Sequence, residues 1–265
     1  MKIALIGNMN NNNFALLRYF LDLGVTVDLF LMSDDGIGSL SHFNPSCDSW
    51  NVKKYIKHIK YLDAPNRFVT IIGNDFPWNI YFWLKYFLNF FNNKKNLTIF
   101  PPPNYSKIKK QLSNYQIIIG SGVSPALFEK INLKLDVFYP YSMGIELVQE
   151  HQIDHALKAS NFIRKFIIKS VRNIQIKGIK KTKKILCVDG GITKFIFKKI
   201  NVETKMITFP FIYKEEKPQK LPKKISEIIF KLSQYDISFI SHTRHCYINR
   251  DEINQEEYNS KHSKH

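Results

Sequence analysis

Short hydrophobic runs alternate with amphipathic segments from the start of the chain. KIALIG (2–7) is an apolar run that ends in Gly7, which is typical of a strand buried on both faces. FALLRYFLDLG (14–24) has apolar residues at helical spacing with Gly24 as a C-terminal cap, and VTVDLFLM (25–32) predicts a second strand. This order of strand, helix and strand predicts a right-handed βαβ unit of a parallel sheet.

The alternation continues downstream. Further apolar runs predict strands at RFVTIIG (67–73), LTIF (97–100), YQIIIGSG (115–122), LDVFYPYS (135–142), KILCVDG (184–190) and KMITFPFIY (205–213). Helical patterns cover SPALFEKIN (124–132), with Ser124 as N-cap and Pro125 at the first position, a long amphipathic stretch (152–178) and GITKFIFKKIN (191–201). We therefore predict an α/β domain over residues 1–212, with a Rossmann-like, doubly wound parallel sheet.

A second domain is expected after this one. Residues 213–224 are polar and include Pro218 and Pro222, which is typical of a linker. Beyond it, KISEIIFKLSQY (224–235) predicts a helix and DISFISHTRHCY (236–247) a strand. We expect residues 225–265 to be the beginning of an incomplete C-terminal domain.

The segment DFPWNIYFWLKYFLNFF (75–91) is almost entirely apolar. It is too short to span a bilayer, so it predicts a fully buried helix or a helix that lies in a membrane interface. Burial is the default for a soluble protein, whereas the basic charge of the chain favours the interface.

Net charge and cysteine spacing limit the expected classes of partner and the expected compartment. The net charge is +17, which favours a nucleic acid, an anionic membrane surface or a phosphorylated substrate. The basic clusters are scattered and no nucleic-acid motif accompanies them, so no nucleic-acid partner is expected. Cys47, Cys187 and Cys246 are far apart without a CxxC pair, which indicates reduced thiols in a cytoplasmic protein.

The terminal histidines raise the question of a metal site. His242 and His245 share the spacing H-x2-H with His262 and His265, but no cysteine pair accompanies them. His151 and His155 are four residues apart on a predicted helix, where exposed histidines are commoner than metal ligands. We predict no metal site.

Two segments at the carboxyl ends of predicted strands are candidates for ligand binding. IGNMNNNNF (6–14) lacks the GxGxxG fingerprint, which disfavours a dinucleotide. Asn8 and Asn10 to Asn13 offer amides to sugar hydroxyls or satisfy the N-terminus of the following helix. In GSGVSP (120–125), Ser121 and Gly122 precede a helix where a phosphate or sugar oxygen is welcome, or they form a tight turn.

The segment GSGVSPALFEKINLKLDVFYPYSMGIELV (120–148) resembles the N-terminal domain of bacterial GT-B-fold glycosyltransferases of the group 1, or family 4-like, class. That branch reads as a strand ending in G-S-G, a short helix and a segment of the type D-x-F-x-P-Y-G-x-D-x-E. The matching positions here are Asp136, Phe138, Pro140, Tyr141, Gly144 and Glu146. Ser142 stands where the family has Gly, and Ile145 stands where it has Asp.

The resemblance implies an enzyme of polysaccharide or lipooligosaccharide assembly that transfers a sugar from a nucleotide-sugar donor to a cell-surface glycan or lipid-linked acceptor. It implies no cofactor, and it identifies no catalytic residue. The acceptor contacts expected from position are Asn8, Asn10, Asn11, Ser121, Gly122, Ser142 and Glu146, while His242, Arg244 and His245 would face the cleft between two domains.

In that family the donor is bound by the C-terminal domain, through a motif that this sequence does not contain. We therefore expect a truncated form with little activity alone. The expected location is cytoplasmic, with peripheral contact at the anionic inner face of the plasma membrane as an option. The alternative is a non-enzymatic Rossmann-like module that binds an anionic partner or a membrane surface.

Overall fold

The computed structural model describes most of the first 206 residues and a few residues beyond them. The described residues are 1–32, 44–45, 51–63, 67–91, 103–140, 143–149, 153–154, 157–158, 160, 162–187, 192–206, 213, 226–227, 230–231 and 234. The chain divides into two compact units, Met1–Lys217 and Pro218–His265. The fold below is that of the first unit, and the domain and linker boundaries inferred from the sequence stay predictions.

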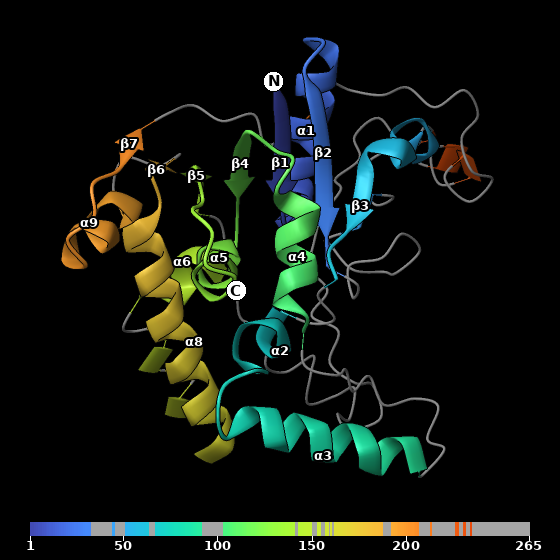
Figure 1. Cartoon of the computed structure of the whole chain (residues 1–265). Coiled ribbons are helices and arrows are strands. Elements are labelled where there is room, and N and C mark those ends of the chain that lie inside the picture. The colour runs from blue at the N-terminus through green and yellow to red at the C-terminus, as the bar shows by residue number, and fades with distance from the viewer. Residues whose placement is uncertain are drawn as a thin grey trace. The chain divides into compact units, whose positions relative to one another are not determined.

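A parallel sheet forms the centre of the first unit (Figure 1). Its strands lie in the order β3-β2-β1-β4-β5-β6, with β7 beside β6, and every pairing is parallel. The strands are β1 (Lys2–Ile6), β2 (Thr26–Leu31), β3 (Ile59–Tyr61), β4 (Ile117–Gly120), β5 (Val137–Phe138), β6 (Lys184–Cys187) and β7 (Lys205–Met206). This order confirms the predicted Rossmann-like α/β fold. The chain reverses its direction of travel across the sheet between β1 and β4.

Helices pack on both faces of the sheet. They are α1 (Asn12–Asp22), α2 (Arg67–Ile72), α3 (Trp78–Phe91), α4 (Tyr105–Leu112), α5 (Ser124–Lys130), α6 (Met143–Glu146), α8 (Phe162–Lys181) and α9 (Ile192–Lys199), with 3-10 turns η1 (Met9–Asn11) and η4 (Val52–His58).

Alternate residues of each central strand enter different cores. Leu5 and Leu29 join a core with α1 and η4, whereas Ala4 and Ile6 join a larger core with α2, α4, α5 and α8. Both faces are therefore buried, which explains why the central strands are largely apolar.

The structure corrects two expectations about local structure. Residues 67–72, expected as part of a strand, form α2, in which Ile71 and Ile72 are both fully buried. Periodicity alone does not separate a short buried helix from a short strand. Ser124 is not the N-cap of α5: that position is Val123, and Ser124 already belongs to the helix.

Other expectations are met in part. The long helix expected at 152–178 appears as α8, which extends to Lys181, and Ser160 before it lies in a bend. The strands expected at LTIF (97–100) and DISFISHTRHCY (236–247) lie outside the described residues. Neither β3 nor α4 was expected from the sequence.

The apolar segment 75–91 contains the helix α3, but the default expectation of full burial is wrong. Trp78 is buried, whereas Leu84 and Phe87 expose more than half of their surface and Trp83 exposes 44%. Among the described helices, none is both long and apolar enough to cross a membrane.

Candidate functional site

The loops after β1 and β4 lie side by side where the strand order reverses. Ile6 at the end of β1 is in register with Gly120 at the end of β4, and the Ser121 amide donates to the Ile6 carbonyl across 3.1 Å. In open α/β sheets, ligands bind beyond the carboxyl ends of the strands at such a reversal. The two segments selected from the sequence, 6–14 and 120–125, are therefore brought together as expected for parallel strands.

One side chain joins these two loops. The side-chain nitrogen Nδ2 of Asn13 lies 3.1 Å from the Ile6 carbonyl, 2.6 Å from the Gly7 carbonyl and 3.3 Å from Ser121 Oγ. Asn13 is fully buried. It belongs to the asparagine run noted in the sequence, but nothing in that run distinguishes it from its neighbours.

Asn8 and Asn11 bind each other and the start of α1. Asn8 Nδ2 donates to Asn11 Oδ1 across 2.7 Å, and Asn8 Oδ1 accepts a bond from the Phe14 amide across 2.8 Å. Both side chains are buried, and Asn11 has a left-handed backbone with φ of 59°. These contacts support the capping role left open in the sequence, in which the amides satisfy the chain itself.

Two neighbouring positions complete the asparagine run. Asn12 Oδ1 accepts from the Asn13 amide across 2.6 Å, and Asn12 Nδ2 is buried with no hydrogen-bond partner in the described part of the chain. Asn10 belongs to η1 through its backbone, while its side chain lies outside the described residues.

Hydrogen bonds from α8 hold the loop after β4 in place. Gly122 has a φ of +60°, a conformation that favours glycine, and its carbonyl accepts a bond from Gln175 Nε2 across 3.0 Å. The same Gln175 accepts from the Ala126 amide at the start of α5. Ser124 Oγ lies against Gly120, where an added Cβ would meet it at 2.1 Å, so the absence of a side chain at Gly120 makes room for Ser124.

The loop after β5 reaches the same place. A Cβ built on Gly144 would lie 2.8 Å from the Gly122 carbonyl oxygen and 3.0 Å from the Phe138 ring. Only glycine allows this approach without displacement. Gly144 and Glu146 belong to α6, and Glu146 is exposed.

Three loops thus converge at the carboxyl edge of the sheet, and they carry six of the seven positions expected from the sequence to contact the acceptor: Asn8, Asn10, Asn11, Ser121, Gly122 and Glu146. Ser142 lies outside the described residues, as do His242, Arg244 and His245. A ligand-binding role for any of these positions stays a prediction.

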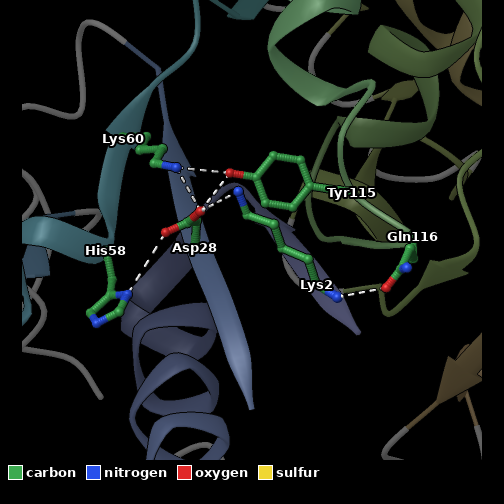
Figure 2. Close-up of polar contacts among 6 residues, drawn as sticks. All are labelled: Lys2, Asp28, His58, Lys60, Tyr115 and Gln116. Carbon is green, nitrogen blue, oxygen red and sulfur yellow. Dashed lines mark hydrogen bonds and ion pairs between the residues drawn. The ribbon is translucent and has the colours of Figure 1, made fainter.

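A second polar cluster, not expected from the sequence, is centred on Asp28 in β2 (Figure 2). Lys60 Nζ lies 2.6 Å from the Asp28 carboxylate, and the Tyr115 hydroxyl lies 2.5 Å from it. Lys2 Nζ and His58 Nδ1 are each 3.8 Å from its oxygens. Because Lys2 begins β1 and Tyr115 precedes β4, this cluster lies toward the amino ends of the strands, away from the three loops.

The cluster changes the acidity of its members. Burial alone would raise the pKa of Asp28, but the hydrogen bonds from Lys60 and Tyr115 and the charges of Lys60 and Lys2 outweigh it and lower that pKa. Burial alone would lower the pKa of Lys60, and its bonds to Asp28 and Tyr115 raise it instead. Burial and the bond to Asp28 raise the pKa of Tyr115. All three pKa shifts favour a charged Asp28 and a charged Lys60 beside a neutral Tyr115. We interpret this cluster as structural.

Within the described ranges, no group of three or more His, Cys, Asp or Glu side chains is placed to hold a metal ion. No protein-family model matches the sequence, and no curated protein is found to be similar to it. What the structure defines is a Rossmann-like, parallel α/β protein.

Proposed function

We propose that this chain is the acceptor-side part of a GT-B-type glycosyltransferase, which transfers a sugar from a nucleotide sugar to a glycan or a lipid-linked acceptor. The observation that carries the proposal is the convergence of the loops after β1, β4 and β5 at the strand-order reversal, through the bond from Asn13 to Ser121 and the contact of Gly144 with Gly122. The loops after β4 and β5 belong to the segment 120–148, in which the sequence resembles that enzyme class.

The chemistry of the loops supports a neutral, hydroxyl-rich ligand over a dinucleotide. The turn after β1 has one glycine, Gly7, where a pyrophosphate-binding turn requires three. In place of further glycines, this turn has buried asparagines whose side-chain amides form hydrogen bonds within the chain. Among the described residues of the three loops, Glu146 is the exposed carboxylate, and carboxylates are suited to accept hydrogen bonds from sugar hydroxyls.

The proposed role of this part of the enzyme is positioning. Transfer requires an acceptor hydroxyl held against the anomeric carbon, which lowers the barrier by orientation. It also requires cations or donors that stabilise the departing nucleoside diphosphate. In the proposed arrangement these loops supply the first requirement, and the donor side of the enzyme supplies the second.

A binding experiment on the full chain tests the proposal. Saturation-transfer NMR with a panel of simple glycosides measures acceptor binding, and release of nucleoside diphosphate from a panel of nucleotide sugars measures transfer. We expect Gly144→Val to weaken glycoside binding roughly tenfold or more, because its side chain pushes the loop after β5 away from Gly122. Glu146→Gln is expected to weaken it by a smaller factor.

Glu203→Gln is the matched control, since Glu203 is an exposed carboxylate just before β7. It is expected to leave glycoside binding unchanged. Failure of every glycoside to bind, equal binding by all three variants, or preferential binding of a nicotinamide dinucleotide would overturn the proposal.

A further inference from the structure

An unusual apolar surface covers one face of α3. Ile80, Trp83, Leu84 and Phe87 are 49%, 44%, 58% and 51% exposed. Their spacing of three, four and seven residues places them on one side of the helix, and the Trp83 and Phe87 rings lie 5.8 Å apart. Large apolar side chains grouped in this way mark an interaction site. We call this the α3 surface.

The helix α8 packs against the start of α3. Trp78, which is buried at the start of α3, packs against Phe166 of α8 with ring centroids 5.8 Å apart. Phe162 and Phe166 are 81% and 50% exposed and lie four residues apart on one face of α8. Figure 1 shows the beginning of α3 beside the first turns of α8. Exposed aromatic side chains of α8 therefore lie beside the start of α3.

Basic side chains lie on this exposed face of α8. Lys165 and Lys169 are exposed and occupy the same face of α8 as Phe162 and Phe166. The same face leads into a pocket of about 390 Å³ lined by Ile153, Asp154, Leu157, Lys169, Arg172 and Asn173. In its wall the buried Arg172 Nε has no hydrogen-bond partner within the described segments. Apolar groups flanked by Lys and Arg are the composition of helices that lie in an anionic bilayer interface.

We propose that the α3 surface, together with this face of α8, docks on a bilayer that contains anionic phospholipid. In this arrangement the apolar side chains enter the boundary between headgroups and acyl chains, and Lys165 and Lys169 face lipid phosphates. The docking is independent of the glycosyltransferase proposal.

The length of α3 and the net charge of the chain favour docking on an anionic bilayer. They disfavour a helix that crosses the bilayer and a second copy of the chain. With 14 residues, α3 is about 21 Å long at about 1.5 Å per residue, shorter than the ~30 Å hydrocarbon core, so it lies along the interface instead of crossing it. A second copy of the chain would bring a net charge of +17 against another +17. Like charge opposes self-association, whereas an anionic bilayer attracts it.

The position of α3 in the fold determines which edge of the sheet would face the bilayer. The chain passes through α2 and α3 after the carboxyl end of β3 and before α4 returns toward β4. In Figure 1, α3 lies beyond the arrowheads of β1 and β2. The bilayer would therefore face the same edge of the sheet as the three converging loops, an arrangement that suits a lipid-linked acceptor; this last point rests on the proposed function.

Vesicle co-sedimentation of the full chain tests the docking without any sugar. Vesicles of phosphatidylcholine with phosphatidylglycerol are compared with vesicles of phosphatidylcholine alone, and we expect binding to the anionic vesicles to be at least about tenfold stronger. The combined variant Trp83→Ser, Leu84→Ser and Phe87→Ser is expected to lose most of that binding. Phe195→Ser on α9, where the side chain is 60% exposed, is the control and is expected to retain it.

A second pair of variants tests the charges on a single helix. Lys165→Glu with Lys169→Glu is expected to lower the affinity for anionic vesicles by about tenfold or more. Lys177→Glu with Lys180→Glu makes the same change in net charge at exposed positions farther along α8, and is expected to have a much smaller effect. Circular dichroism checks that each variant is folded.

Tryptophan fluorescence of the unaltered chain needs no variant. Brominated lipids are expected to quench it in anionic vesicles. The proposal is overturned by equal binding to both vesicle types, by equal losses in test and control variants, or by a dimer that requires Trp83, Leu84 and Phe87 and does not bind vesicles.

Discussion

The Tyr115 hydroxyl donates a hydrogen bond to the Asp28 carboxylate across 2.5 Å, although the two residues are 87 positions apart in the chain. Lys60 Nζ lies 2.6 Å from the same carboxylate and 2.9 Å from the phenol oxygen. The three residues come from β2, β3 and the turn before β4, so they connect strands on both sides of β1 (Figure 2). The Asp28 side chain is only 8% exposed, so it depends on these partners.

Removing the phenol oxygen should therefore destabilise the fold. We expect Tyr115→Phe to lower the free energy of unfolding by about 1–2 kcal/mol, because a largely buried carboxylate loses a hydrogen bond. Tyr61→Phe is the control, since the Tyr61 side chain is 40% exposed, and it should change stability by less than about 0.5 kcal/mol. Urea unfolding followed by circular dichroism measures both. Equal losses would show that the bond to Asp28 contributes nothing.

The same cluster predicts a pH dependence. The pKa of Asp28 is lowered in the folded state, so its contribution to stability is present above the unfolded pKa of about 3.9 and disappears as the pH falls through the lower, folded value. We expect Asp28→Asn to be less stable than the unaltered chain at neutral pH, and the difference to shrink below about pH 4. Urea unfolding at a series of acidic pH values measures it. A difference that stays constant or grows on acidification would contradict the charged assignment of Asp28.

Asn13 should be the most sensitive asparagine of its run. We expect Asn13→Ala to lower the free energy of unfolding by about 2–3 kcal/mol, because the Ile6 and Gly7 carbonyls and Ser121 Oγ lose a buried donor. Asn114→Ala, at an exposed position before β4, is the control and should cost less than about 0.5 kcal/mol. Thermal unfolding of both variants measures the difference. If Asn13→Ala loses no more stability than Asn114→Ala, the Asn13 side chain does not stabilise the contact between the loops after β1 and β4.

Sequence patterns predict the centre of this fold because the centre is buried on both faces. After Lys2, β1 is apolar and is followed by Gly7, and β4 is an apolar run that ends in Gly120. β2 is apolar except for Thr26 and Asp28. β3 escaped prediction because it is a three-residue strand, Ile59–Tyr61, with Lys60 at its middle. Its stability comes from pairing with β2 and from the contact of Lys60 with Asp28, and neither is visible in local sequence.

The candidate site was predictable in position but not in detail. The carboxyl ends of parallel strands share one edge, so the loops after β1 and β4 could be placed together from the pattern alone. The asparagine that joins them could not be chosen, because several asparagines of the run are buried and only the contact with Ser121 distinguishes Asn13. The partner of Asn13, Ser121, is 108 residues away. Long-range hydrogen bonds of this kind leave no periodic signal.

The contact between α5 and α8 provides the sharpest test of packing near the site. A Cβ built on Gly178 would lie 1.9 Å from the Pro125 carbonyl oxygen, so α8 can approach α5 only because residue 178 has no side chain. In an unhindered helix, Gly→Ala stabilises by about 1 kcal/mol. Here we expect Gly178→Ala to destabilise by about 1–3 kcal/mol, since the helices must move apart.

The same displacement should reach the loop after β4, because Gln175 lies one turn earlier on α8 and binds the Gly122 carbonyl. Lys177→Ala, at the exposed neighbouring position, is the control and should change stability by less than about 0.5 kcal/mol. Urea unfolding measures the stability, and amide hydrogen exchange of Ala126, whose N–H binds Gln175, measures the loop. If Gly178→Ala is as stable as the unaltered chain and Ala126 keeps its protection, then α5 and α8 are not held at the distance described, and the loop after β4 is not positioned by α8.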